Sequence, residues 1–291
     1  MRSRYKMTPY TLIIPAITVI IITMIVPIII AMGISLTDAK LLTFSKAKYV
    51  GLKNYANFLK DKNFRYVITA TSFYVIGGVG LTYFFGLITA TILNQKIKGH
   101  FIFRALMILP WVIPQVVLVL IFRWMLNPQY GVINFLLSSV KIIPRDFGWL
   151  SDVKFALLAI LMVTVWKQYP LGCLILLAGM KSIPDELYEA ASVDGANGFR
   201  KFLHITLPGL RYVTAVLILL LVIWSFGNFV IIWLMTQGGP ANRTATLTIF
   251  TFLNAFKFSK LGYAASIGFV TLIGSLIFSI VYYRFYIKKL D

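Results

Sequence analysis

The chain has 291 residues, of which 59% are hydrophobic and 13% are charged, and its formal net charge is +19. Soluble domains average nearer half apolar and a quarter charged residues, so this composition excludes an ordinary soluble domain. A single cysteine and two histidines exclude a disulfide framework and a clustered metal site, and we expect no cofactor.

The apolar residues fall in long blocks, and about 20 apolar residues are enough to cross a bilayer as a helix. The pattern predicts an all-α polytopic membrane protein with six transmembrane helices, near residues 9–36, 66–93, 101–126, 153–179, 209–236 and 263–286. The first block is longer than the roughly 7–15 apolar residues of a signal peptide, so it predicts an uncleaved span. Small residues at 77–80 (GGVG) permit close helix packing, and Cys173 is expected to pack inside a span.

One polar stretch, Glu186–Pro208 (ELYEAASVDGANGFRKFLHITLP), interrupts this apolar pattern. Ser182 is expected to cap a helix whose first turn carries a proline and two acidic residues. Gly195 is expected to take the positive φ that ends this helix. A second short helix, roughly Phe199–Ile205, is then expected to stop at Pro208. The pattern predicts a helix–turn–helix that lies outside the lipid.

The spacing inside this stretch is specific. Glu189-Ala190-Ala191 is followed after three residues by Gly195, and after nine more residues by Ile205-Thr206-Leu207-Pro208. This pattern resembles the EAA loop of the membrane subunits of bacterial ABC importers, which is cytoplasmic and docks into a cleft on the ATPase subunit. The resemblance implies an ATPase-docking site made of Glu189, Ala190, Ala191, Asp194 and Gly195. The alternative is an ordinary amphipathic hairpin at the membrane interface.

The resemblance extends over nearly the whole chain. Three further segments, Val50–Leu59, Arg104–Leu137 and Thr236–Leu247, resemble the carbohydrate branch of the same family. It implies a type I ABC importer permease fold with a cytoplasmic EAA coupling-helix loop at 182–208. Residues 1–65 would hold the N-terminal tail, the first helix and an external loop, and residues 66–291 the transmembrane core. The implied partners are a second related permease in a heterodimer, two ATP-binding cassette subunits, and an extracellular solute-binding protein that delivers a sugar.

The loop charges do not decide the sidedness of the chain, because the loops on the two sides carry nearly equal numbers of lysine and arginine. The resemblance places the loop at 182–208, and with it both termini, in the cytoplasm of a bacterial cell with the chain in the cytoplasmic membrane. In so apolar a chain we expect the basic residues to lie beside anionic membrane lipid, and we expect no nucleic-acid partner.

The sequence has no phosphate-binding loop of its own. No segment matches G-x-x-x-x-G-K-[ST], and no Ser/His/Asp cluster suggests hydrolysis. We therefore expect a transport subunit rather than an enzyme, with ATP hydrolysed by partner subunits. A secondary transporter or channel is the alternative in another class, but it would need coupling-ion sites, often intramembrane Asp or Glu, and the predicted spans hold none. A further alternative keeps the ABC class and changes the cargo to glycerol phosphate or another polyol.

Polar side chains within spans usually face a bundle interior or an aqueous cavity. Three segments supply such side chains: Trp111 and Gln115; Thr164, Lys167 and Gln168; and Ser225 and Asn228. They resemble the places where sugar-importing relatives line a mid-membrane site, and their mixture of an aromatic ring, amides and hydroxyls suits a sugar. We expect them to line the substrate path of a transporter that works by alternating access, and interhelical hydrogen bonding is the alternative.

Lys167 lies near the centre of its predicted span, and no Asp or Glu lies within a span to pair with it. A buried lysine must find a carboxylate, carbonyl groups or water, or lose its proton. One hypothesis is that Lys167 faces the carboxylate or phosphate of an acidic solute. The other is that it donates hydrogen bonds to neutral hydroxyls, carbonyls or water.

Overall fold

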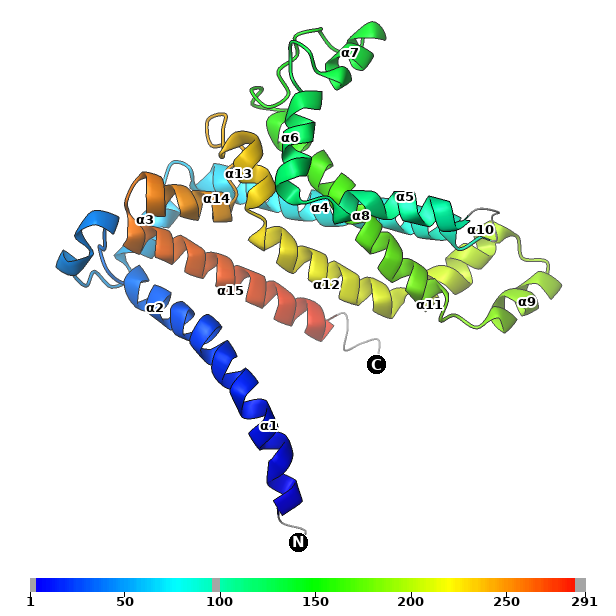
Figure 1. Ribbon diagram of the computed structural model, residues 1–291, viewed down its shortest axis with the longest axis horizontal. Coiled ribbons are helices and arrows are strands. Elements are labelled where there is room, and N and C mark those ends of the chain that lie inside the picture. Colours follow the sequence, from blue (N-terminus) through cyan, green and yellow to red (C-terminus); the bar gives the residue numbers. More distant parts are fainter. Residues whose placement is uncertain (1–3, 96–99, 286–291) are drawn as a thin grey trace. The chain divides into compact units, whose positions relative to one another are not determined.

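Figure 1 shows the computed structural model of the chain, in which residues 4–95 and 100–285 are described. Within these ranges the chain is helical and contains no strand beyond an isolated antiparallel bridge between Thr37 and Tyr49. Four helices are long and apolar enough to cross a membrane alone, and two bent helix pairs bring the number of candidate spans to as many as six. The expectation of an all-helical polytopic membrane protein is confirmed.

The chain divides into two compact units, and the first comprises Met1–Phe64 and Phe250–Leu272. Its helical segments are α1 (Arg4–Ile20), a π-helical turn (Ile21–Ile25), α2 (Val26–Ser35), a 3₁₀ helix (Leu41–Lys46), α3 (Lys53–Lys60), a second π-helical turn (Leu253–Lys257) and the part of α15 (Leu261–Phe285) up to Leu272. Figure 1 shows α1 and α2, in blue, following one another as a long rod. The candidate span along this rod, Leu12–Ser35, buries none of its apolar window.

Side-chain amides and aromatic rings hold the first unit together. Asn54 is buried, and its Nδ2 donates to the carbonyl of Ser35 at 2.8 Å and to that of Thr37 at 2.7 Å. Phe58, which is 1% exposed, contacts the rings of Phe64 and Tyr263 edge-on. The segment Val50–Leu59, which carries part of the family resemblance, therefore fixes α3 against the end of α2.

The second unit comprises Arg65–Ile249 and Ile273–Asp291. Its helical segments are α4 (Phe64–Leu93), α5 (His100–Val112), α6 (Gln115–Met125), α7 (Val132–Ser139), α8 (Ala156–Met180), α9 (Asp185–Val193), α10 (Gly198–Lys201), a π-helical turn (Phe202–Thr206), α11 (Leu207–Gly209), α12 (Arg211–Gly227), α13 (Val230–Thr236), the start of α14 (Leu247–Phe252) and the rest of α15. Buried side chains of α4, α8 and α12 form one hydrophobic cluster at its centre.

Glycines let the backbones of α4 and α8 touch. A Cβ built on Gly86 would lie 3.0 Å from the backbone nitrogen of Cys173 and 3.1 Å from the carbonyl carbon of Gly172. Cys173 is 2% exposed and belongs to the hydrophobic cluster, which confirms its expected packing role. The GGVG segment also packs closely, because a Cβ on Gly77 would lie 3.0 Å from the Leu161 side chain.

We expect Gly86→Ala to lower the free energy of unfolding by about 1–2 kcal/mol, because the added methyl group forces two backbones apart. Gly80 on the same helix is the matched control, since a Cβ there meets nothing within 4 Å. Gly80→Ala should leave stability unchanged or raise it by about 0.5–1 kcal/mol through helix propensity. Detergent-denaturant unfolding of the purified chain measures both, and equal effects would mean that α4 and α8 separate at no cost.

Two of the predicted spans are not continuous helices. The span at 101–126 consists of α5 and α6, whose described parts meet at 94°. Pro114 caps α6 with ψ 137°, and a proline both lacks an amide hydrogen and pushes the preceding residue out of helical geometry. The predicted span at 209–236 is interrupted as well, because α12 ends at Gly227 and Asn228 is extended before α13 begins. At this break the Thr248 hydroxyl donates a hydrogen bond to the carbonyl of Phe226 at 2.6 Å.

Candidate docking loop and solute path

Gly195 ends α9 in the predicted way. Its φ is +74°, a left-handed conformation that residues with a Cβ rarely adopt. The amide of Ala196 donates to the carbonyl of Ala191 at 2.8 Å, and the amide of Gly195 donates to that of Ser192 at 3.1 Å. This pair of bonds is a Schellman motif, which satisfies the last carbonyls of the helix and fixes the direction of the chain beyond it.

The two ends of the loop differ from the expectation. Ser182 does not cap α9, because its hydroxyl donates backwards to the carbonyl of Gly179 at 2.8 Å and Pro184 occupies the cap position. The second helix begins at Gly198, capped by the Asn197 side chain, which accepts from the amide of Arg200 at 2.9 Å. The helix also does not stop at Pro208 but runs on to Gly209. Pro208 lies in the first turn after the π-helical turn, where a missing amide hydrogen is tolerated.

Hydrogen bonds within the loop connect its two helical parts, and its outer side chains are exposed. The hydroxyls of Tyr188 and Thr206 lie 3.0 Å apart, and Nζ of Lys201 donates to the Ser192 hydroxyl at 2.6 Å. These bonds connect α9 to the helical segment that follows Gly195. Outside them, the residues of the predicted docking set are exposed or half-buried: Glu189, Ala190, Ala191, Asp194 and Gly195.

Apolar side chains beside the docking set are exposed as well. Val193 is 89% exposed and Phe199 is 69% exposed, one on each side of the Gly195 turn. Large apolar side chains grouped on a surface mark a contact with a partner or a membrane. The loop therefore offers a surface of small, acidic and apolar groups held in one geometry by the Schellman turn.

Lys167 lies on α8 and connects this helix to the break between α5 and α6. Its Nζ donates to the carbonyl of Trp111 at 3.0 Å and to that of Ile113 at 2.7 Å. Both carbonyls belong to the break between α5 and α6, where the regular helical hydrogen bonds stop. Of the two hypotheses for this side chain, the structure supports donation to carbonyl groups.

The hydroxyls of two other predicted solute contacts are used within the protein. Thr164 is 1% exposed, donates to the carbonyl of Ile160 at 2.9 Å and lies 2.9 Å from the hydroxyl of Tyr74 on α4. Ser225 is 5% exposed and donates to the carbonyl of Leu221 at 2.7 Å. For Thr164 the structure thus shows an interhelical hydrogen bond, the alternative role for such residues.

Four predicted solute contacts keep free polar groups. The side chains of Trp111, Gln115, Gln168 and Asn228 make no hydrogen bond to another residue in the described part of the chain. Gln115 and Gln168 are half-buried, and Asn228 is buried at the break between α12 and α13. Lys167 brings the first two segments together, and α13 contacts both α6 and α8. These three amides and the indole of Trp111, which is 45% exposed, are the polar groups left available to a solute.

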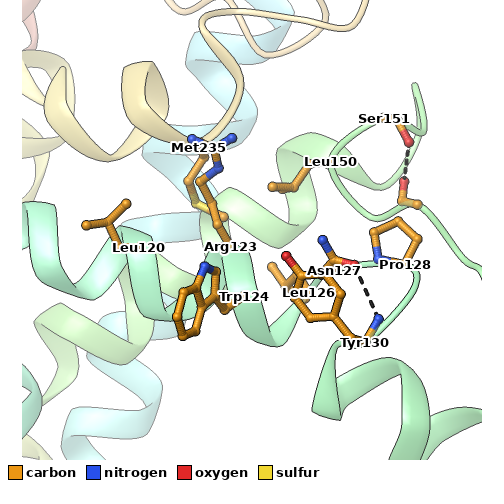
Figure 2. Close-up of a pocket in the computed structure, with 11 residues that line it drawn as sticks. Leu120, Arg123, Trp124, Leu126, Asn127, Pro128, Tyr130, Leu150, Ser151 and Met235 are labelled. Carbon is orange, nitrogen blue, oxygen red and sulfur yellow. Dashed lines mark hydrogen bonds between the residues drawn. The ribbon is translucent and has the colours of Figure 1, made fainter.

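A cavity of about 580 Å³ lies at the end of α6 opposite the Pro114 break (Figure 2). Its lining residues include Arg123, Trp124, Asn127, Tyr130 and Met235. None of the solute contacts predicted from the sequence lines it. The signal that points to it is the run RWMLNPQY, residues 123–130, in which a cation, two aromatic rings and amides follow the end of an apolar block.

The broken and unbroken spans, the buried lysine at a helix break and the exposed helix–glycine–helix loop together define a helical membrane permease. The family model described as binding-protein-dependent transport system inner membrane component matches residues 82–288. The chain belongs to this family. It is therefore a membrane transport subunit of ABC type, and the resemblance seen in the sequence is confirmed.

Known relatives match over almost the full length. The chain is 36% identical to the trehalose/maltose transport system permease protein MalF of Thermococcus litoralis over 276 residues, which cover 94% of this chain and 92% of the relative. It is 32% identical to the probable ABC transporter permease protein YurN of Bacillus subtilis, covering 98% of each. A crystal structure of a bacterial ABC transporter that imports the acidic polysaccharide alginate has a chain with a TM-score of 0.83 at 18% identity, covering 99% of each. That likeness shows the fold, an ABC importer permease fold.

Proposed function

We propose that the chain is the permease subunit of an ATP-driven importer that passes a carbohydrate, an oligosaccharide, from an external binding protein across the bacterial cytoplasmic membrane by alternating access. Family membership supports the transport class, and the trehalose/maltose relative supports the cargo. The single observation that carries the mechanism is the exposed loop closed at Gly195, with its EAA spacing. Family membership also disfavours the alternative of a transporter that works without an ATPase.

In this proposal the membrane is crossed six times, with α5 and α6 counted as one span and α12 and α13 as another. Residues 1–65 form the tail, first helix and external loop, and residues 66–291 form the transmembrane core. The loop at 182–208 and both termini lie in the cytoplasm. The apolar window of the span Leu12–Ser35, none of which is buried, offers surface to lipid or to a second permease in a heterodimer.

The docking set transmits the work of two ATP-binding cassette subunits. Glu189 makes a polar contact with the ATPase, while Ala190 and Ala191 keep the contact surface small. The Schellman turn at Gly195 holds α9 at a fixed angle to the segment that leads into α12. A movement of the ATPase cleft would reach the spans through this connection.

The solute path is assigned to the free polar groups. Trp111, Gln115, Gln168 and Asn228 would face the sugar, because the structure leaves their donors and acceptors open to it. Thr164 would hold α8 against α4 through its contact with Tyr74. The Ser225 hydroxyl is engaged within its own helix, by the carbonyl of Leu221. Lys167 would fix the shape of the break beside them.

The test is co-purification of the chain with the candidate permease and ATP-binding subunits encoded beside its gene. The wild-type chain is expected to hold the ATPase, and Glu189→Lys combined with Gly195→Pro is expected to lose at least about 90% of it. A tenfold loss corresponds to about 1.4 kcal/mol, which a reversed charge in a docked contact readily exceeds. Proline cannot adopt a φ of +74°, so the same variant also removes the turn.

The control is Glu186→Lys, the same charge reversal one turn earlier on α9 and outside the EAA spacing. It should leave ATPase binding within about twofold, as expected of a surface substitution. Membrane insertion is checked for each variant by its resistance to alkaline extraction. A wild-type chain that transports solute without any ATPase would refute the proposed function.

A further inference from the structure

The cavity at the end of α6 has pre-formed walls (Figure 2). Asn127 Oδ1 accepts from the amide of Gln129 at 2.8 Å and from that of Tyr130 at 3.3 Å, which fixes the turn that follows α6. Met235 of α13 and, from the loop before α8, Gly148, Leu150 and Ser151 also line it. The volume of about 580 Å³ lies in the range of small-molecule sites.

The walls carry the groups that recognise a sugar ring. Trp124 is 73% exposed and Tyr130 is 68% exposed, so both aromatic faces are open to a ligand. Figure 2 shows Trp124 next to Arg123, and Tyr130 next to Asn127, around the same space. The Nδ2 of Asn127 makes no hydrogen bond to another residue in the described ranges and remains a donor. Aromatic faces cover the apolar face of a ring, and an amide pairs with its hydroxyls.

Arg123 adds a positive charge to the wall of the cavity. Its Nη1 donates to the carbonyl of Leu234 at 3.3 Å, and it pairs with no carboxylate among the described residues. Asp152, which follows the lining residue Ser151, instead accepts from the amides of Lys154 and Phe155 in its own turn. A guanidinium has five N–H donors in a planar fork that matches a carboxylate, and most of these remain available.

We propose that this cavity is an entry subsite for an acidic sugar unit, a uronate whose carboxylate pairs with Arg123 and whose ring lies against Trp124. The inference rests on the proposed carbohydrate import and specifies the class of solute. Lys167, the other candidate for recognising an acidic solute, is engaged by two carbonyl groups. In this proposal Arg123 is therefore the group that recognises the acidic unit.

The experiment compares two probes of equal length, trigalacturonate and maltotriose, on the full chain in nanodiscs of zwitterionic lipid by titration calorimetry. The wild type should bind trigalacturonate at least about tenfold more tightly than maltotriose, as expected for a charge-assisted bidentate contact. Arg123→Gln should remove this preference. Arg123→Lys should keep part of it, and Trp124→Leu should weaken both probes alike.

Lys141→Gln is the matched control, because Lys141 is an exposed cation that lines a different cavity. It should leave both affinities unchanged. The proposal is overturned if neither probe binds, if the wild type shows no preference, if Arg123→Gln keeps the preference, or if Lys141→Gln removes it equally. Arg123 also links α6 to α13, so folding is checked by thermal melting. If Arg123→Gln unfolds, the Arg123→Lys and Trp124→Leu titrations decide, and unchanged affinities in both overturn the proposal.

The two proposals fail separately. A chain that holds its ATPase but shows no uronate preference loses only the entry subsite. A chain that binds trigalacturonate through Arg123 but never holds an ATPase loses the importer mechanism and keeps the subsite.

Discussion

Gly262→Ala is expected to lower the free energy of unfolding by about 3 kcal/mol, the upper end of the usual cost of overpacking. A Cβ on Gly262 would overlap the carbonyl oxygen of Thr37 and lie 3.2 Å from the backbone nitrogen of Ala39. The amide of Gly262 also donates to the carbonyl of Ala39 at 2.9 Å, so the helix cannot move away without losing this bond. The neighbour is backbone rather than a flexible side chain, and it has little freedom to yield.

Gly274→Ala on the same helix is the control, because a Cβ there meets nothing within 4 Å. It should stabilise the chain slightly or leave it unchanged. Unfolding is followed by tryptophan fluorescence as SDS replaces a mild detergent around each purified variant. If both alanines behave alike, α15 does not seat against the Thr37 segment in the way the structure shows.

The same contacts explain the segment Val50–Leu59. Asn54 donates to the carbonyls of Ser35 and Thr37, and Tyr55 lies 2.7 Å from the Ser35 hydroxyl. These bonds hold the Thr37 carbonyl where Gly262 approaches it. The segment Val50–Leu59 therefore stabilises the packing of the first unit. Asn54 donates to the carbonyl of Thr37, and Gly262 packs closely against the same carbonyl.

Features governed by local chemistry could be predicted from the sequence. The positive φ of Gly195 is an example. A glycine in a polar stretch at the expected end of a helix favours this conformation, because glycine adopts it without steric cost. The tight packing at Gly77 and Cys173 follows from small residues in an apolar block. The helical class follows from block length, because backbone groups in lipid must be satisfied within the helix.

Features that depend on distant partners could not be predicted. The break at Asn228 is stable because Thr248, far along the chain, donates to the carbonyl of Phe226. The continuation of the helix through Pro208 depends on a π-helical turn that no hydropathy pattern shows. Ser182 does not cap α9, since its hydroxyl bonds backwards to the carbonyl of Gly179 at the end of α8. Asn197 caps the next helix, α10, instead.

The candidate site shows the same division. The sequence singled out polar side chains within spans, and the structure finds some free and others bonded to neighbouring helices. The cavity beside Arg123 was missed because its residues follow the end of α6, where polar and aromatic side chains are ordinary at a membrane interface. Only the fold brings Gly148, Leu150, Ser151 and Met235 to the same cavity.

Lys167→Met is expected to lower the free energy of unfolding by about 2–4 kcal/mol, because two carbonyl groups at the helix break lose a charged donor. Methionine matches lysine in length and fills the same space, so the loss reports the bonds to Trp111 and Ile113 rather than a cavity. Lys167→Arg keeps the donors and should recover part of the loss. Lys181→Met at the exposed end of the same helix is the control and should cost no more than about 1 kcal/mol, the scale of a helix-terminus charge.

The effect on transport separates the two hypotheses for this side chain. If Lys167 holds the break, Lys167→Met reduces uptake of neutral and acidic oligosaccharides by the same factor, because the shape of the path changes for every solute. If Lys167 faces an anionic group, the variant loses acidic solutes alone, and the carbonyl bonds at 3.0 and 2.7 Å would have to open during transport. Uptake by proteoliposomes of the assembled importer, with trigalacturonate and maltotriose in parallel, measures this ratio. We expect an unchanged ratio for Lys167→Met and a changed ratio for Arg123→Gln. Lys167 bonds the break at one end of α6, whereas Arg123 lines the cavity at the other end.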